Sequence, residues 1–176
     1  VRDVRVPLLF GSDQEEDGAG GPRLYNAAFM LGPAGNTTAV YRKINLVPWG
    51  EFIPLKRYLY FVSPLVDSLT DFSPGTSIVL FPVGSHLVST AICYEVVFPG
   101  LIRQAVNAGS ELLTTITNDA WYGQSSAPFQ HFELASLRAI EQGRYLDLLR
   151  RSGAARFEPV YVRPAWFEPV ALACEV

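Results

Sequence analysis

The chain has 176 residues, of which 49% are hydrophobic and 18% are charged, and its formal net charge is −3. This length and composition suit one globular domain with its own core and exclude a disordered chain. The small negative charge and the lack of a basic run exclude nucleic acid as a partner. No run of about 18 apolar residues predicts a membrane span. The 2 cysteines, Cys93 and Cys174, belong to no CxxC or HxxxH pattern, so no disulfide framework, metal site or other cofactor is expected.

The first part of the chain is typical of strands joined by loops. Val4–Phe10 alternates and then becomes apolar, which predicts a strand, whereas the acidic, glycine-rich Gly11–Arg23 predicts an exposed loop. Leu24–Leu31 and Thr37–Val40 flank a Gly-Pro turn and are expected to form a hairpin. The second of these strands continues through Tyr41–Leu46 until prolines and a glycine end regular structure.

An apolar arm over residues 55–72 follows, framed by prolines and beginning with Lys56 and Arg57. One interpretation is a loop and helix packed on the core. The other is an arm that contacts lipid or an acyl chain, because aromatic residues beside Lys and Arg favour the boundary between water and membrane.

The second half alternates strands with helices. Ser77–Val83, Leu87–Tyr94 and Glu111–Thr117 are expected strands, and helices are expected near residues 101–108 and from Gln130 to about Leu146. This order predicts an α/β layered architecture. The second helix carries a broad apolar face: Phe132, Leu134, Ala135, Leu137, Ala139 and Ile140.

Cys93 lies where a strand stops before a turn and a helix. A thiol in such a position loses its proton more easily, and the thiolate is the nucleophile. The alternative is a small buried side chain at a strand end, which is the common fate of a lone cysteine.

Lys43 and Glu51 also lie at a strand end and in the turn that follows it. A lysine cation favours the thiolate and stabilises an oxyanion, and a carboxylate can orient that lysine and carry the thiol proton. The backbone N–H of Tyr94 is a natural second oxyanion donor. Taken singly, Lys43 or Glu51 is more simply a solvated surface charge.

Three motifs together resemble the nitrilase, or carbon–nitrogen hydrolase, superfamily and within it the catalytic domain of the apolipoprotein N-acyltransferase family. The similarity covers roughly Val6–Tyr145. The motifs are YRKINLVPWGEFIP at 41–54, ICYE at 92–95 and NDAWYG at 118–123, extended by PFQH at 128–131 and RAIEQGR at 138–144.

The resemblance implies a nitrilase-like αββα sandwich, incomplete at both ends. Residues 1–146 would form the catalytic domain without the family's N-terminal strand and membrane helices, and residues 147–176 a divergent tail of unknown role. It implies Cys93 as nucleophile, Lys43 as oxyanion-stabilising lysine and Glu51 as an additional active-site glutamate. The remaining implied site residues are Tyr94, Glu95 and Arg144 as pocket support, and Trp49, Trp121 and Tyr122 as a possible substrate channel or simple packing.

The implied reaction moves a fatty acyl chain from a phospholipid to Cys93 as a thioester. The chain then passes to the α-amino group of a diacylglyceryl-cysteine at a lipoprotein N-terminus. The partners would be the phospholipid donor, the diacylated lipoprotein and, through the arm at 55–72, the membrane surface. The implied location is the outer side of the bacterial inner membrane.

Two departures from the family pattern are visible. No residue matches the family's general-base glutamate, since Glu15 and Glu16 lie in an acidic, glycine-rich stretch, so we expect this chain to be inactive alone. After Arg144 the family's next strands are not expected to follow. His131 is assigned a structural role. Two other functions stay open, a soluble amidase of the same superfamily and a non-catalytic remnant that binds lipid.

Overall fold

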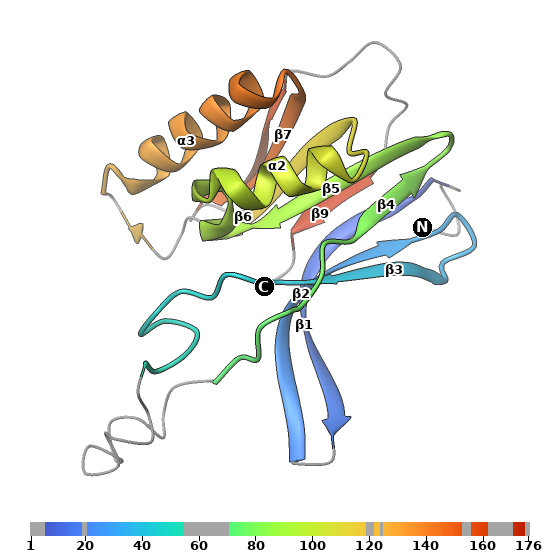
Figure 1. The fold of residues 1–176 in the computed structure, drawn as a ribbon, viewed down its shortest axis with the longest axis vertical. Helices are drawn as coiled ribbons and strands as arrows, with labels where there is room; N and C mark the ends of the chain where they lie inside the picture. Colours follow the sequence, from blue (N-terminus) through green and yellow to red (C-terminus); the bar gives the residue numbers. More distant parts are fainter. Residues whose placement is uncertain are drawn as a thin grey trace.

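The computed structural model describes residues 6–18, 21–54, 71–118, 122–123, 125–152, 156–161 and 171–174. Two sheets face each other, and helices cover the outer face of one of them (Figure 1). The first sheet has the strand order β3-β2-β1-β9 in the described residues. Its strands are β1 (Leu8–Gly18), β2 (Gly21–Leu31), β3 (Thr37–Arg42) and β9 (Ala171–Cys174).

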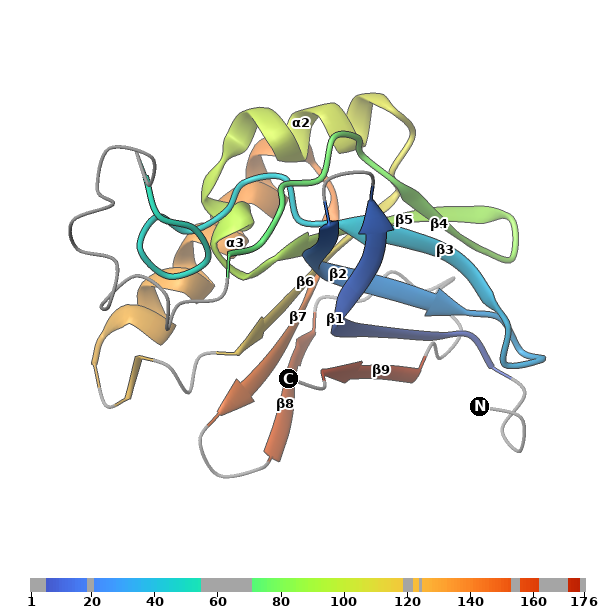
Figure 2. The same cartoon turned by 90° about the horizontal axis from the view of Figure 1, so that it is seen from below.

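The second sheet has the order β4-β5-β6-β7-β8, and its central strands β5, β6 and β7 are parallel. Parallel neighbours need crossover connections, and the helices α2 and α3 provide them on one face of the sheet (Figure 2). The bounds are β4 (Leu80–Val83), β5 (His86–Ile92), the short 3₁₀ helix η3 (Cys93–Val97), α2 (Pro99–Asn107), β6 (Leu112–Asn118), α3 (Ala127–Gln142), β7 (Tyr145–Ser152) and β8 (Arg156–Tyr161).

Alternation along the strands divides the apolar residues between two cores. One core joins the inner faces of the two sheets, and the other joins the second sheet to the helices. The buried members of the first are Leu9, Ala28, Met30, Tyr41, Phe81, Val88, Ile92, Leu112 and Ile116; those of the second are Ala91, Val96, Ile102, Leu113, Ala135 and Leu146.

The acidic, glycine-rich stretch predicted as an exposed loop is instead the outer half of a long hairpin. β1 and β2 stay in register from Leu8↔Leu31 to Gly18↔Gly21. Arg42 of β3 supports its outer face through an ion pair to Glu16 at 3.0 Å and a hydrogen bond to Gln14 at 2.9 Å. Side chains on both faces are polar there, so the sequence lacks the alternation of apolar and polar residues from which a strand is predicted.

α3 begins and ends before its predicted limits. Gly143 takes a left-handed conformation (φ 58°) that ends the helix, and Tyr145 already starts β7. The expected apolar face is only partly packed, because Ala135 is fully buried while Leu137 is 47% and Ile140 77% exposed.

β7 crosses the boundary predicted at residue 146. It pairs with β6 from Leu112↔Tyr145 to Asn118↔Arg151, so a strand is present where the sequence suggested that the family's strands do not follow. Residues 153–155, 162–170, 175 and 176 of the predicted tail lie outside the described residues.

The apolar arm at 55–72 lies mostly outside the described residues, which resume at residue 71. Its end is attached to the turn that carries Glu51, because the Phe72 N–H donates to the Glu51 carbonyl at 2.9 Å. Phe72 also bridges to Leu24 of β2. In the part of the chain that the structure describes, no helix has the length and apolar character needed to cross a membrane.

Gly75 gives a test of the close packing behind β3. Its N–H donates to the Lys43 carbonyl at 2.7 Å, and a Cβ added there would overlap the carbonyl oxygen of Arg42. We expect Gly75→Ala to lower the unfolding free energy by at least about 2 kcal/mol and the melting temperature by roughly 4–8 °C, measured by thermal denaturation. The matched control is Gly100→Ala in the first turn of α2, where a Cβ meets nothing within 4 Å; a similar loss there would contradict the packing explanation.

Candidate active site

A buried ion pair lies at the end of β3. Lys43 is 1% exposed, and its Nζ lies 2.8 Å from Oε1 and 2.7 Å from Oε2 of Glu51. The Glu51 carboxylate also accepts hydrogen bonds from the Asn26 side-chain amide at 2.7 Å and from the Val47 N–H at 2.8 Å. The turn after β3 therefore folds back so that its carboxylate holds the lysine, as burial of a cation requires.

Cys93 occupies a sharp bend at the end of β5. Its φ is 51°, a left-handed conformation that costs a non-glycine residue about 1 kcal/mol or more. β5 ends at Ile92 and η3 begins at Cys93, so the bend turns the chain off the sheet at this residue. The Cys93 side chain is partly exposed and packs against the core between the sheets.

His131 of α3 holds the backbone at this bend. Its Nε2 lies 3.0 Å from the carbonyl oxygen of Cys93. A carbonyl can only accept, so Nε2 carries the hydrogen. The structural role predicted for His131 is thus supported by a contact with the backbone of the residue that carries the thiol.

Glu95 is completely buried two residues beyond Cys93. Its Oε1 accepts from the backbone N–H groups of Ile44 at 2.7 Å and Asn45 at 3.0 Å, and its Oε2 accepts from the N–H of Ile92 at 2.9 Å. The Tyr41 hydroxyl lies 2.9 and 3.0 Å from the two oxygens. Burial raises the pKa of Glu95, and these hydrogen bonds oppose that rise.

This carboxylate connects the two halves of the site. One oxygen bonds the residue after Lys43, and the other bonds the residue before Cys93. Lys43 and Cys93 therefore each lie one residue from a group bonded to Glu95, although they belong to different sheets. A thiol and a buried ammonium group whose neighbouring residues are bonded to one carboxylate suit nucleophilic attack on a carbonyl carbon, because the cation stabilises the negative charge that develops on oxygen.

The aromatic residues expected near the site have different positions. Tyr94 packs edge-on against Phe98, with ring centroids 5.2 Å apart. Trp49 is 61% exposed with a φ of 65°, and Tyr122 is 39% exposed. Trp121 lies outside the described residues.

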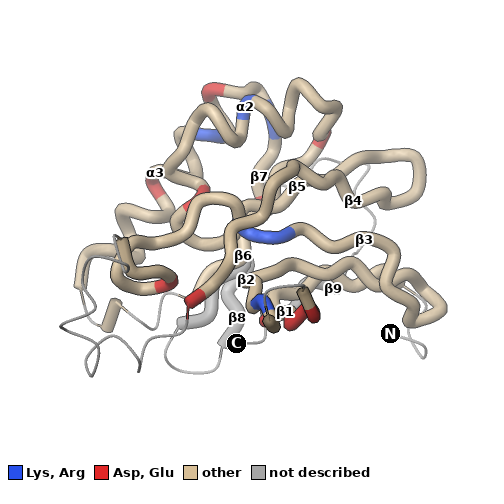
Figure 3. Tube along the Cα trace, turned by 60° about the horizontal axis from the view of Figure 1, so that its bottom comes forward, with Lys and Arg blue, Asp and Glu red and all other residues tan. Residues whose placement is uncertain are grey.

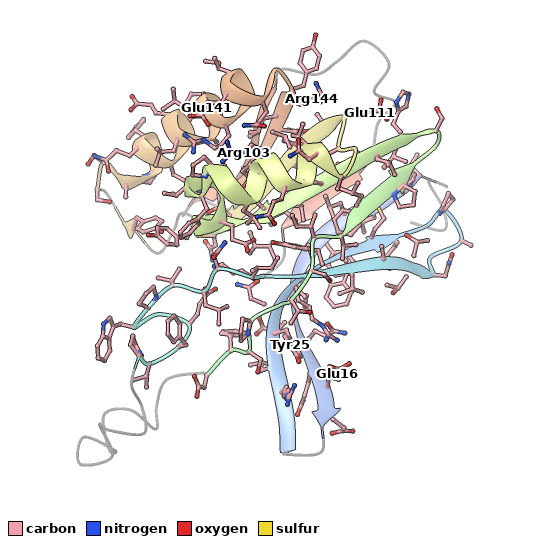
Figure 4. All side chains as sticks on the ribbon, in the orientation of Figure 1. Glu16, Tyr25, Arg103, Glu111, Glu141 and Arg144 are labelled. Carbon is pink, nitrogen blue, oxygen red and sulfur yellow. The ribbon has the colours of Figure 1, made fainter. Side chains whose placement is uncertain are left out.

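Arg144 is not brought to the other site residues. It lies at the start of β7, where its Nε donates to the Ser110 carbonyl at 3.1 Å. Figure 4 shows it beside Glu111, far from the hairpin that carries Tyr25. The strands β5, β6 and β7 are parallel, so their amino ends lie on one side of the second sheet and their carboxyl ends on the other. Arg144 precedes β7 at the amino ends, whereas Cys93 follows β5 at the carboxyl ends. Its placement does not support the predicted role in the pocket.

Sequence reasoning missed Asn26 and Tyr41, which hold the two carboxylates of the site. A polar amide directly before an apolar run in β2 was the available signal for Asn26. Tyr41 carried none, because a buried tyrosine reads as an ordinary core residue until its hydroxyl partner is known. Within the described ranges, no three His, Cys, Asp or Glu side chains gather into a possible metal site.

Residues 1–155 of the chain match the carbon–nitrogen hydrolase family. The apolipoprotein N-acyltransferase of Geobacter metallireducens is 41% identical over 141 residues, which are 80% of this chain and 27% of that protein. The corresponding protein of Chlorobaculum tepidum is 32% identical over 164 residues, 86% of this chain and 31% of the relative. The chain thus spans less than a third of the length of these relatives.

Solved structures of an amidase from Nesterenkonia sp. share the fold. One has a TM-score of 0.58 at 23% identity and covers 86% of this chain and 49% of the amidase. Another from the same organism has a TM-score of 0.57 and covers 89% of this chain and 53% of the amidase. The family match over residues 1–155 confirms the nitrilase-like fold that the motifs predicted, and this structural likeness agrees with it.

Glu95 supplies the first test of the site. Glu95→Gln keeps the size of the side chain but turns an amide NH₂ toward backbone donors. We expect the free energy of unfolding in urea to fall by about 2–4 kcal/mol. Glu141→Gln is the control, because Glu141 is 44% exposed and its ion pair with Arg138 is worth about 1 kcal/mol at most. Equal stability of the two variants would argue against the connecting role.

His131 supplies the second test of the site. We expect His131→Ala to slow alkylation of Cys93 by iodoacetamide about 3- to 10-fold, because the hydrogen bond that holds the strained bend is worth about 0.5–1.5 kcal/mol. The rate is read from the Cys93 peptide by mass spectrometry. His86→Ala is the control, since His86 begins β5 at its other end and contacts Glu111 at 2.8 Å; a comparable slowing there would count against a local effect.

Proposed function

Because this chain belongs to the carbon–nitrogen hydrolase family, we propose that it carries the active site of a lipoprotein N-acyltransferase. The acyl chain of a phospholipid passes to Cys93 as a thioester and then to the α-amino group of a diacylglyceryl-cysteine. The relatives named apolipoprotein N-acyltransferase, at up to 41% identity, support an acyltransferase. The observation that carries the proposal is the buried ion pair of Lys43 and Glu51, together with the Glu95 carboxylate that bonds the backbone beside Lys43 and beside Cys93.

In the first step the Cys93 sulfur attacks the ester carbonyl carbon of the donor. The C–S bond forms, the C–O bond to the lysophospholipid breaks, and the thiol proton passes to the departing alkoxide oxygen. Lys43 supports the oxyanion, Tyr94 contributes its N–H, and Glu51 orients the lysine. A thioester divides one difficult transfer into two easier ones.

The second step brings the acceptor amine to the same carbonyl carbon. The C–N bond forms and the C–S bond breaks. One proton leaves the nitrogen for the sulfur, which restores the thiol. No residue of the chain matches the family's general-base glutamate, so we expect this chain alone to be inactive in turnover and capable only of the slow first transfer to Cys93.

The apolar arm supports a lipid substrate. Its last residue, Phe72, is bonded to the Glu51 carbonyl, so the arm returns to the main structure at the turn that holds the lysine. We place the site at the outer surface of the bacterial inner membrane, where this arm would contact lipid. A soluble amidase is the second candidate, favoured by the amidase structures that share the fold.

Mass spectrometry of Cys93 tests the proposal. We expect one acyl group on the Cys93 peptide after long incubation with phospholipid vesicles, none in Cys93→Ala, and at least about 100-fold slower formation in Lys43→Met, because one oxyanion donor is lost. Cys174→Ala and Arg42→Met are the controls; Arg42 neighbours Lys43 but lies on the opposite face of β3, paired with Glu16. Ammonia release from small amides without acylation by phospholipid would favour the amidase instead.

A further inference from the structure

Asp13 of β1 is exposed and lies on the face of the first sheet that is turned toward the second sheet. Leu9 and Gly11 point into the core on that face, since Leu9 is fully buried and a Cβ added to Gly11 would lie 3.3 Å from Ile116 Cγ2. Side chains alternate along a strand, so Asp13 points the same way, one step beyond the core.

Asp13 lies in a polar row that crosses the first sheet. It is directly opposite Asn26 in the register of β1 and β2, and the Lys43 N–H donates to the Asn26 carbonyl at 2.8 Å. Side chains opposite each other in this way have Cβ atoms about 4.5–5.5 Å apart. The Asn26 amide bonds Glu51, so Asp13 stands beside the ion pair of the proposed active site.

Packing between the two sheets links this row to the end of β5 that carries Cys93. Ile116, which Gly11 approaches, is the register partner of Ile92, and Cys93 follows Ile92. Asp13 is therefore two residues along β1 from a packing contact with the strand that pairs with the end of β5 before Cys93.

The charges of the row do not balance. Lys43 is engaged by both oxygens of Glu51, Asn26 is neutral, and no described side chain forms an ion pair with Asp13, which is itself exposed. Partial desolvation by the surrounding chain and, to a smaller degree, the charge of Glu51 raise the pKa of Asp13. Figure 3 shows that acidic positions also gather along the outer half of β1. A cation entering beside Asp13 would relieve this excess of negative charge.

We propose that Asp13 binds the ammonium group of the acceptor, a step that rests on the proposed acyl transfer and names what draws the amine into the site. An α-amino group has a pKa of about 8 and is mostly protonated at neutral pH. The bound ammonium gives one proton to solvent before it attacks, because only the free amine has the lone pair that forms the C–N bond. A carboxylate accepts a charge-assisted hydrogen bond from it and gives an amine an advantage over water or an alcohol, which carry no charge.

Binding to a protein that cannot be acylated tests this assignment. In the Cys93→Ala protein, we expect a diacylglyceryl-cysteine peptide of neutral sequence to bind about ten-fold more tightly than its N-acetylated form. Asp13→Asn should abolish this preference and leave the N-acetylated peptide's affinity unchanged. Asp13→Glu should retain part of it, and Asp17→Asn, on the same strand and face but four residues further along, should retain all of it.

Equal affinity for the two peptides in the Cys93→Ala protein, no binding of either, or a full preference in Asp13→Asn would each overturn the role of Asp13. These outcomes do not depend on acyl transfer. A wild-type chain that gains no acyl group on Cys93 would instead contradict the proposed function, whichever way the binding experiment ends.

Discussion

The candidate site depends on one buried carboxylate. Glu95 is fully enclosed, and three backbone N–H groups from two distant segments donate to it together with a tyrosine hydroxyl. Burying a carboxylate is costly unless its oxygens are satisfied. Neither segment satisfies them alone, so the turn after β3 and the end of β5 must meet at one place. This requirement fixes the position of the bend at Cys93 relative to Lys43.

The division of the chemistry between two sheets follows from this connection. The first sheet carries Asn26 and Lys43 in one polar row, and the second carries Cys93 at the end of a parallel strand. Parallel strands present their carboxyl ends at one edge, which is where α/β proteins usually place their sites. Apolar residues next to these positions, among them Ala28, Tyr41 and Ile92, pack between the two sheets. The site therefore lies where the facing surfaces of the sheets change from apolar to polar.

Much of the fold could be predicted because its local signals agree with its tertiary structure. The strands around Val88 and Leu113 and the helix after Pro99 have the expected periods, and Lys43 meets Glu51 as their strand-and-turn positions suggested. The outer half of the β1–β2 hairpin could not be predicted, because its stability comes from cross-strand pairing between polar residues. The end of α3 was missed because an apolar pattern continues past Gly143 into a strand.

The sequence by itself determined the class of the protein and the residue types of the site, since motifs such as KINLVPWGE and ICYE are contiguous and can be recognised without a structure. Only the tertiary structure decided which of those residues meet. It joined Glu95 to Ile44, placed His131 on the Cys93 carbonyl and left Arg144 at the opposite sheet edge. The reason is physical: spacing along the chain records which groups are present, whereas the pairing of a buried charge with its donors is a long-range property of the folded sheets.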